Sequence, residues 1–288
     1  MGNAIKPHIK NAEKTGVLQI ANTGLHEFPR EMFQLVNVLR TLDISNNKIG
    51  NLPPTIGNFT NLKNLTACQI KIAIFHYAPC CNAYLCKCCV FFYCLQLVFF
   101  RIRCYLHCLL FSLSSPYAHP TNFSSLPEEI GTLKKLESIN FSNNDLTSLP
   151  ASFVQLVNLR TINLSYNKIT NLQPVFTNMK KLELLDMSHN KLVEVPDHVK
   201  EVAAIEINFS SNQISVLSEA IAECNRLKVL RVDENCLQLS AVPEKILTDS
   251  QISLLSIDGN LFESKDLHAR EGWEKYMERF TATKKKLY

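Results

Sequence analysis

Short stretches in which apolar and polar residues alternate recur along the chain, and most of them end in two polar residues and an asparagine. Residues 159–172, LRTINLSYNKITNL, show the pattern clearly. Alternation with a period of two predicts a strand that buries one side. A tract of the form LPxxIxxLxxL follows several stretches, and its proline places it outside a sheet. Further copies occupy residues 18–29, 39–53, 136–150, 182–196, 204–217, 227–237 and 252–262.

The asparagine of this pattern recurs at a nearly constant interval. Asn144, Asn167 and Asn190 lie 23 residues apart, and Asn212 and Asn235 follow after 22 and 23 residues. A unit this short cannot bury its apolar side alone. Successive units are therefore predicted to stack into a solenoid.

The copies fit L-x-x-L-x-L-x-x-N-x-L, the template of the leucine-rich repeat superfamily, which the chain resembles over residues 1–67 and 119–288. The MGN start, the tract VDENCLQLS and the tract YMERFTATKKK add to the resemblance. It implies an α/β solenoid, a curved horseshoe with a parallel sheet on its concave face and asparagines that bridge adjacent turns. It also implies an N-myristoylated, membrane-associated protein without enzymatic activity, with the lipid on Gly2.

Residues 68–118 interrupt the repeats. From Asn47 to Asn144 is 97 residues, which is two periods of 23 plus 51. Nine of the eleven cysteines fall in the window 68–121, which carries basic residues and no acidic ones. Removing 51 residues joins LKNLTA to HPTNFSSLPEEI as one repeat, so the segment is predicted to be an insertion between a strand and its corner.

Three interpretations of this insertion compete. A membrane span would need about 20 apolar residues, whereas the charge-free run between Lys87 and Arg101, Cys88–Phe100, has 13. A metal site would need regular cysteine spacing, and two separated C-x2-C pairs are absent. The sequence favours the third interpretation, a segment without a selected function that is not part of the fold.

The two ends of the chain carry distinct signals. Gly2 after Met1 is required for N-myristoylation, although Lys6 stands where the motif asks for Ser or Thr. One myristoyl chain binds membranes only marginally, and Lys6, Lys10 and Lys14 could supply a second signal. At the other end, Trp273, Tyr276, Met277 and Phe280 share one helical face and predict a cap over the last repeat.

Outside the insertion the charges of the chain balance, which argues against a nucleic-acid partner. The N-terminus lacks the apolar region of a secretory signal, which favours a cytoplasmic location.

The chain is predicted to divide into five segments. They are a lipidation and basic segment at 1–15, repeats at 16–67, the insertion at 68–118, further repeats at 119–262, and a cap helix with a basic tail at 263–288.

Polar residues between the apolar strand positions are expected on the concave face. They are interpreted either as a ladder that binds a protein partner or as short side chains that suit a crowded inward curve. One stripe has a residue from each strand, and serines form a second stripe beside it. The candidate partner-binding residues are Asp43, Asn140, Arg160, Asn163, Tyr166, Asp186, His189, Asn208, Arg231 and Asp233.

The sequence favours a non-enzymatic interaction scaffold tethered to the cytoplasmic leaflet by its lipid. No P-loop, Gly-rich dinucleotide turn, HExxH motif or nucleophile elbow occurs. We therefore expect no cofactor, no metal and no small-molecule substrate. The alternative is a soluble regulatory repeat subunit that docks on a phosphatase or small-GTPase complex, which rests on fold analogy.

Overall fold

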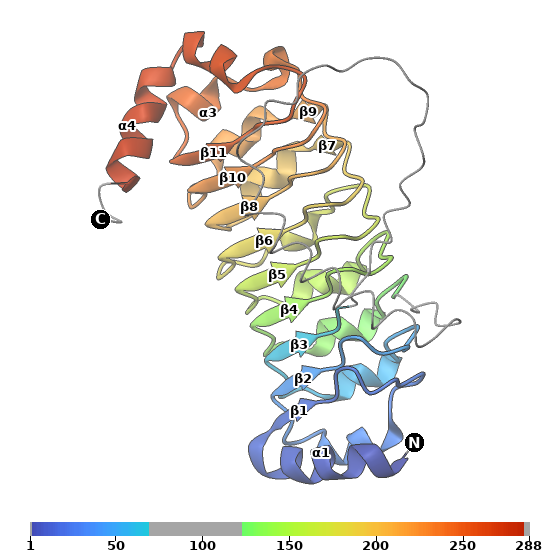
Figure 1. The fold of residues 1–288 in the computed structure, drawn as a ribbon. Helices are drawn as coiled ribbons and strands as arrows, with labels where there is room; N and C mark the ends of the chain where they lie inside the picture. The colour runs from blue at the N-terminus through green and yellow to red at the C-terminus, as the bar shows by residue number, and fades with distance from the viewer. Residues whose placement is uncertain (1, 69–122, 285–288) are drawn as a thin grey trace, which may run out of the picture. The chain divides into compact units, whose positions relative to one another are not determined.

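The computed structural model describes residues 2–68 and 123–284, which belong to one compact unit (Figure 1). The predicted insertion at 68–118 lies outside the described residues, apart from Cys68. The predicted tail beyond Lys284 lies outside them as well.

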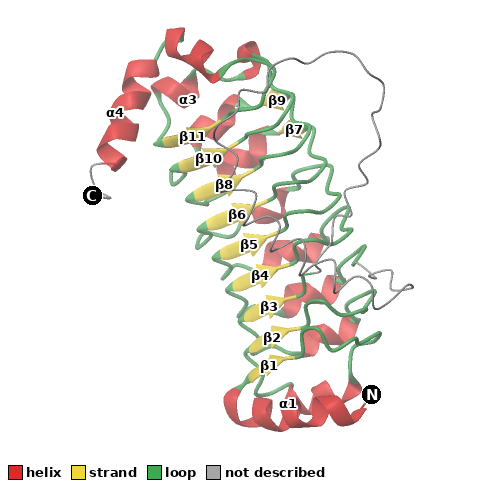
Figure 2. Cartoon of the chain, in the orientation of Figure 1, coloured by secondary structure: helices red, strands yellow, loops and turns green. Residues whose placement is uncertain are grey.

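Three-residue strands form one parallel sheet in chain order, and two strands of two residues each pair separately from it (Figure 2). In nearly every strand the middle residue is buried and its two neighbours are exposed or half-buried, as alternation with a period of two predicts. The fold class expected from the repeats is thereby confirmed. In the described residues the sheet comprises β1 (Val17–Gln19), β2 (Thr41–Asp43), β3 (Asn64–Thr66), β4 (Ser138–Asn140), β5 (Thr161–Asn163), β6 (Leu184–Asp186), β8 (Glu206–Asn208), β10 (Val229–Arg231) and β11 (Leu254–Ser256).

Short 3₁₀ helices lie across the core from the strands (Figure 2). Most follow a proline in extended conformation. Proline suits this position because the first turn of a helix does not need the N–H that proline lacks. A small parallel pair, β7 (Glu194–Val195) and β9 (Val216–Leu217), runs beside them. The helices are η1 (Arg30–Leu35), η2 (Pro54–Asn58), η3 (Glu128–Thr132), η4 (Ala151–Gln155), η5 (Pro174–Phe176), η6 (Asp197–Glu201), η7 (Glu219–Glu223), η8 (Leu239–Ala241), η9 (Ser264–Ala269) and the α-helical turn α3 (Lys245–Thr248).

The repeat asparagines are buried inside this stack. The Asn167 amide donates to the carbonyl oxygens of Phe141 at 2.9 Å, Leu164 at 3.0 Å and Ser165 at 3.2 Å. Its Oδ1 accepts from the backbone N–H of Leu146 at 3.0 Å. Two of these partners lie in the preceding repeat, so the prediction that asparagine bridges adjacent turns is confirmed.

The repeat stack is continuous across the interruption. β3 pairs directly with β4, with Leu65 opposite Ile139. Where the chain resumes, the Phe123 N–H donates to Asn144 Oδ1 at 3.1 Å. This bond is equivalent to that from Leu146 to Asn167 in the next repeat, so residues before and after the interruption complete one repeat.

Helices cover both ends of the sheet. At the N-terminus, α1 (Gly2–Thr15) buries Ile5, Ile9 and Ala12 against the first repeat. At the C-terminus, α4 (Trp273–Lys284) lies within the predicted cap segment, and the Tyr276 hydroxyl accepts the free N–H of Leu255 at 3.0 Å. Both helices protect edge strands, which would otherwise offer unpaired backbone groups to another chain.

In the part of the chain that the structure describes, no helix is both long enough and apolar enough to cross a bilayer.

Candidate functional site

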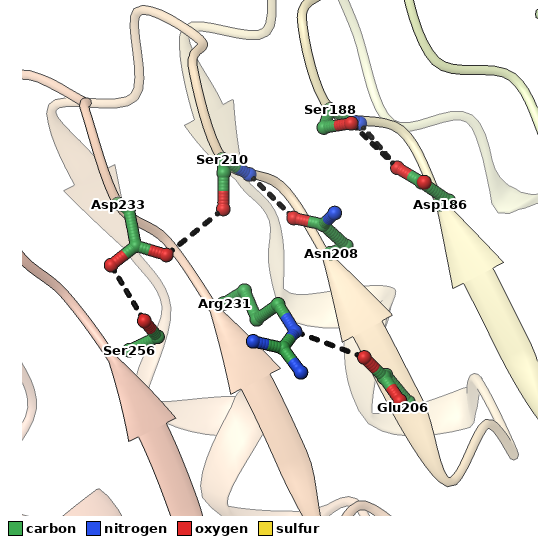
Figure 3. A network of polar contacts seen from close by, with 8 residues as sticks. All are labelled: Asp186, Ser188, Glu206, Asn208, Ser210, Arg231, Asp233 and Ser256. Atoms are coloured by element: carbon green, nitrogen blue, oxygen red, sulfur yellow. Dashed lines mark hydrogen bonds and ion pairs between the residues drawn. The ribbon is translucent and has the colours of Figure 1, made fainter. Parts of the chain in front are cut away.

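The stripe of residues at the strand ends is half-buried, and most of its side chains hydrogen-bond to the turns that follow the strands. Five of its residues accept a hydrogen bond from the backbone N–H two residues later. In Figure 3, Asp186 accepts from Ser188 at 3.0 Å and Asn208 accepts from Ser210 at 3.0 Å. The same bond is made by Asp43, Asn140 and Asn163. These five candidates therefore hold the turns, which supports the structural interpretation of this stripe.

The serine stripe beside it is largely withdrawn from solvent. Ser45, Ser142, Ser165 and Ser188 are buried, although the sequence pattern expected them on the open face. The Ser188 hydroxyl also donates to Asp186 at 2.7 Å. Because these serines are buried, their hydroxyls are not available to a partner.

The charged candidates form local networks. Arg231 Nε donates to Glu206 Oε1 at 3.0 Å across neighbouring strands (Figure 3). Asp233 accepts from the hydroxyls of Ser210 at 3.1 Å and Ser256 at 2.7 Å. These bonds fix the carboxylate and the guanidinium in place on the sheet face, where both remain half-buried.

Ion pairs also line the row of residues that precedes the strands. Arg160 pairs with Glu183 at 2.9 Å, and Lys63 pairs with Glu137 at 2.7 Å. The hydrogen bond and charge of Lys63 lower the pKa of Glu137. Exposed pairs of this kind contribute about 0–1 kcal/mol, so they stabilise little and leave Arg160 accessible.

Tyr166 and His189 form the most distinctive feature of this face. Their rings stack with centroids 4.0 Å apart and planes 11° from parallel. Tyr166 is 46% exposed, and His189 is exposed as well. Both have left-handed backbones, with φ of 55° and 53°, a conformation that disfavours bulky side chains. The structure thus joins two candidates that the sequence had only placed on the same face.

The other titratable groups do not assemble a reactive centre. No cluster of three or more His, Cys, Asp and Glu side chains suited to a metal occurs in residues 2–68 and 123–284. Burial raises the pKa of the Cys224 thiol to about 12, and its Sγ lies 3.3 Å from the Val199 carbonyl oxygen. His189 stacks on Tyr166 while the nearby Ser188 hydroxyl is buried on Asp186, so these side chains do not form a hydrolytic triad.

Comparisons with known protein families find repeat models. A leucine-rich repeat region model matches residues 111–264, starting within the predicted insertion, and a leucine-rich repeat model matches residues 38–59. Plant intracellular Ras-group-related LRR protein 7 of Oryza sativa subsp. japonica is 37% identical over 51 residues, which are 18% of this chain and 20% of the rice protein. The match therefore spans about a fifth of that relative.

Solved structures give the same fold. An internalin, inlF, from Listeria monocytogenes superposes with a TM-score of 0.59 at 16% identity, over 93% of this chain and 61% of that one. Internalin C2 from the same organism superposes with a TM-score of 0.58 at 16% identity, over 88% of this chain and 91% of its own. At these identities the likeness is one of fold.

Proposed function

Because the chain belongs to the leucine-rich repeat family, we propose that it is a non-enzymatic scaffold that binds a protein partner on its sheet face and is tethered to the cytoplasmic side of a membrane by N-myristoylation of Gly2. The observation that carries the partner site is the exposed stack of Tyr166 on His189. Neither ring is needed to fill the core.

The stack has the properties of an interface anchor. Aromatic side chains offer a large contact area with few rotatable bonds, and they are enriched among residues that dominate binding energy. The equivalent left-handed positions in earlier repeats hold Asn46 and Asn143, which tolerate this backbone better. Tyr166 and His189 accept a less favourable backbone and remain exposed, which supports a role in contact. Arg160, Arg231 and Asp233 would add charged contacts elsewhere on the sheet face.

The partner site is tested by replacing both rings. We expect Tyr166→Ala with His189→Ala to weaken partner binding about 30-fold, since loss of an anchor removes about 2 kcal/mol or more. The measurement is quantitative affinity purification of the full chain from its own cells, followed by titration of the recovered partner. The control changes Asn143 and Ser211, the left-handed positions one repeat before and after the stack. Equal partner recovery with all variants would contradict the proposed site.

The lipid tether rests on the N-terminal segment. Gly2 is the first residue of α1, and Lys6, Lys10 and Lys14 are exposed along that helix. A single myristoyl chain binds reversibly, so basic residues near it would strengthen attachment. The absence of Ser or Thr at position 6 makes direct measurement of the modification the decisive step.

The tether is tested by mass and by fractionation. We expect the intact protein from its own cells to lack Met1 and to carry one myristoyl group. Gly2→Ala should move most of the protein from the membrane pellet to the supernatant, because the acylated amine is lost. Conservative replacement of Asn3 by glutamine serves as the control. An unmodified Gly2, or fractionation unchanged by Gly2→Ala, would instead favour the soluble regulatory subunit that docks on a phosphatase or small-GTPase complex.

We further propose that residues 68–118 are an insertion outside the repeat fold. The direct pairing of β3 with β4 and the position of Phe123 support this division. The same mass spectrum tests it, since a product lighter by that segment would be consistent with repeats that need none of it. The flanking divisions at 1–15, 16–67, 119–262 and 263–288 follow the two end helices and the repeats between them.

A further inference from the structure

A shallow hollow of about 400 Å³ lies where α1 ends and the first strands begin. Four cationic side chains line it, against the single carboxylate of Glu13. The cations are Lys14, Arg40, Lys63 and Lys135. They come from α1 and from the residues before β2, β3 and β4, so the stack brings together charges that are up to 121 positions apart in the sequence.

Three of the four cations lack a carboxylate partner in the part of the chain that the structure describes. Lys63 pairs with Glu137, and Lys135 donates to Asn61 Oδ1 at 2.7 Å. For Lys14 and Arg40 the described residues offer no ion pair or side-chain hydrogen bond. Farther along the same row, Arg160 is paired with Glu183. The hollow is thus a local excess of positive charge on a chain that is otherwise nearly balanced.

The backbone around Gly16 fixes the position of one of these cations, Arg40. Gly16 turns the chain from α1 into β1 with φ of 70°, and its carbonyl oxygen accepts from the Arg40 N–H at 2.7 Å. A Cβ on Gly16 would come within 3.0 Å of Arg40 Nε, so the guanidinium lies directly over this turn. Arg40 is therefore held near Lys14.

The hollow continues the basic side of α1. Lys6, Lys10 and Lys14 are four residues apart and fall in one stripe of the helix, beside the buried stripe of Ile5 and Ile9. From Lys6 to Lys14 the stripe rises about 12 Å. It starts close to the proposed acylation site and ends in the hollow, and α1 packs against the β1 end of the sheet (Figure 1).

We infer that this basic surface, Lys6, Lys10, Lys14, Arg40, Lys63 and Lys135, docks on anionic phospholipid headgroups. The inference rests on the proposed membrane tether and divides its second signal between the repeats and the N-terminal segment. Clustered cations attract anionic leaflets, and a single acyl chain needs such an addition for stable attachment. The hollow's lining has no aromatic side chain on which a nucleic-acid base could stack, which favours a lipid partner.

The test uses the full chain without its acyl group and vesicles of defined composition. We expect cosedimentation with phosphatidylcholine vesicles containing about one-third phosphatidylserine, little with phosphatidylcholine alone, and loss of binding as salt rises to about 0.5 M. Lys14→Ala with Arg40→Ala should weaken binding about 30-fold. Arg40→Lys should retain it, because the charge is kept and only the geometry of the guanidinium is lost.

The matched control removes the same charge elsewhere. Lys180→Ala with Lys228→Ala takes away two exposed cations outside the hollow and should leave binding within about twofold of the unchanged chain. Equal loss in both double variants, or equal binding to both kinds of vesicle, would overturn the inference. Since no acyl group is present, neither result bears on whether Gly2 is myristoylated or whether Tyr166 and His189 bind a partner.

Discussion

Replacing Asn167 by alanine is expected to lower the free energy of unfolding by about 3–4 kcal/mol, since buried groups left without partners each cost about 1–3 kcal/mol. The asparagine is buried and makes four hydrogen bonds to backbone groups, at 2.9, 3.0, 3.2 and 3.0 Å. Alanine would leave the Leu146 N–H and the Phe141 carbonyl without that partner in a closed interior. The loss would fall on the contact between two repeats, which is where a solenoid gains its stability.

Urea denaturation followed by circular dichroism measures this change. The control is Asn158→Ala, since Asn158 also bridges repeats, donating to the Lys134 carbonyl at 2.7 Å, but does so at an exposed site. We expect the control to cost less than about 1 kcal/mol because water replaces the lost bond. Similar costs for the two variants would show that burial of the repeat asparagines contributes little to the free energy of unfolding.

Replacing Arg279 by alanine is expected to release the C-terminal cap. Its Nε donates to the Ile252 carbonyl at 3.0 Å, and its Nη2 donates to those of Ile246 at 3.0 Å and Leu247 at 2.8 Å. These bonds close the end of α3 and hold α4 against the last repeat. Hydrogen bonds to charged groups contribute about 1.5–3 kcal/mol, so we expect a loss of about 2–3 kcal/mol.

Hydrogen exchange locates the effect of this second change. Loss of the cap should speed exchange at the Leu255 N–H, whose acceptor is the Tyr276 hydroxyl, and leave β4 and β5 protected. Arg226→Ala is the control, because that arginine is exposed and donates to a single carbonyl, of Lys180, at 2.6 Å. Uniform loss of protection along all strands would indicate that the cap and repeats unfold together.

The repeat pattern was sufficient to predict the strands, the asparagines that bridge adjacent repeats, and the cap helix. Each follows from a local rule, because alternation decides which strand residues are buried and the asparagine has the same partners in each repeat. The helical structure of residues 2–15 was not predicted. It depends on Ile5, Ile9 and Ala12 finding the first repeat, a contact that no repeat template contains.

The candidate site was predicted by position but not by role. The sequence placed Asp186 and Ser188 on the open face, whereas their bonds to each other and burial follow from the turn geometry. The Tyr166–His189 stack had an available signal, since the two residues are one period of 23 apart and stand where earlier repeats have asparagine. The basic hollow had a weaker signal, because Lys135 reaches the row of Arg40 and Lys63 only when the repeats are joined across the interruption.

The pairing of β3 with β4 also bears on how the chain folds. Leu65 and Ile139 are 74 positions apart, whereas paired residues in β4 and β5 are separated by 23. Loop-closure entropy grows only with the logarithm of length, so bringing these strands together costs about 1 kcal/mol more than an ordinary repeat. The contact is nevertheless non-local, and non-local contacts slow folding. We therefore expect β1–β3 and β4–β11 to nucleate as two blocks, with their docking as the late step.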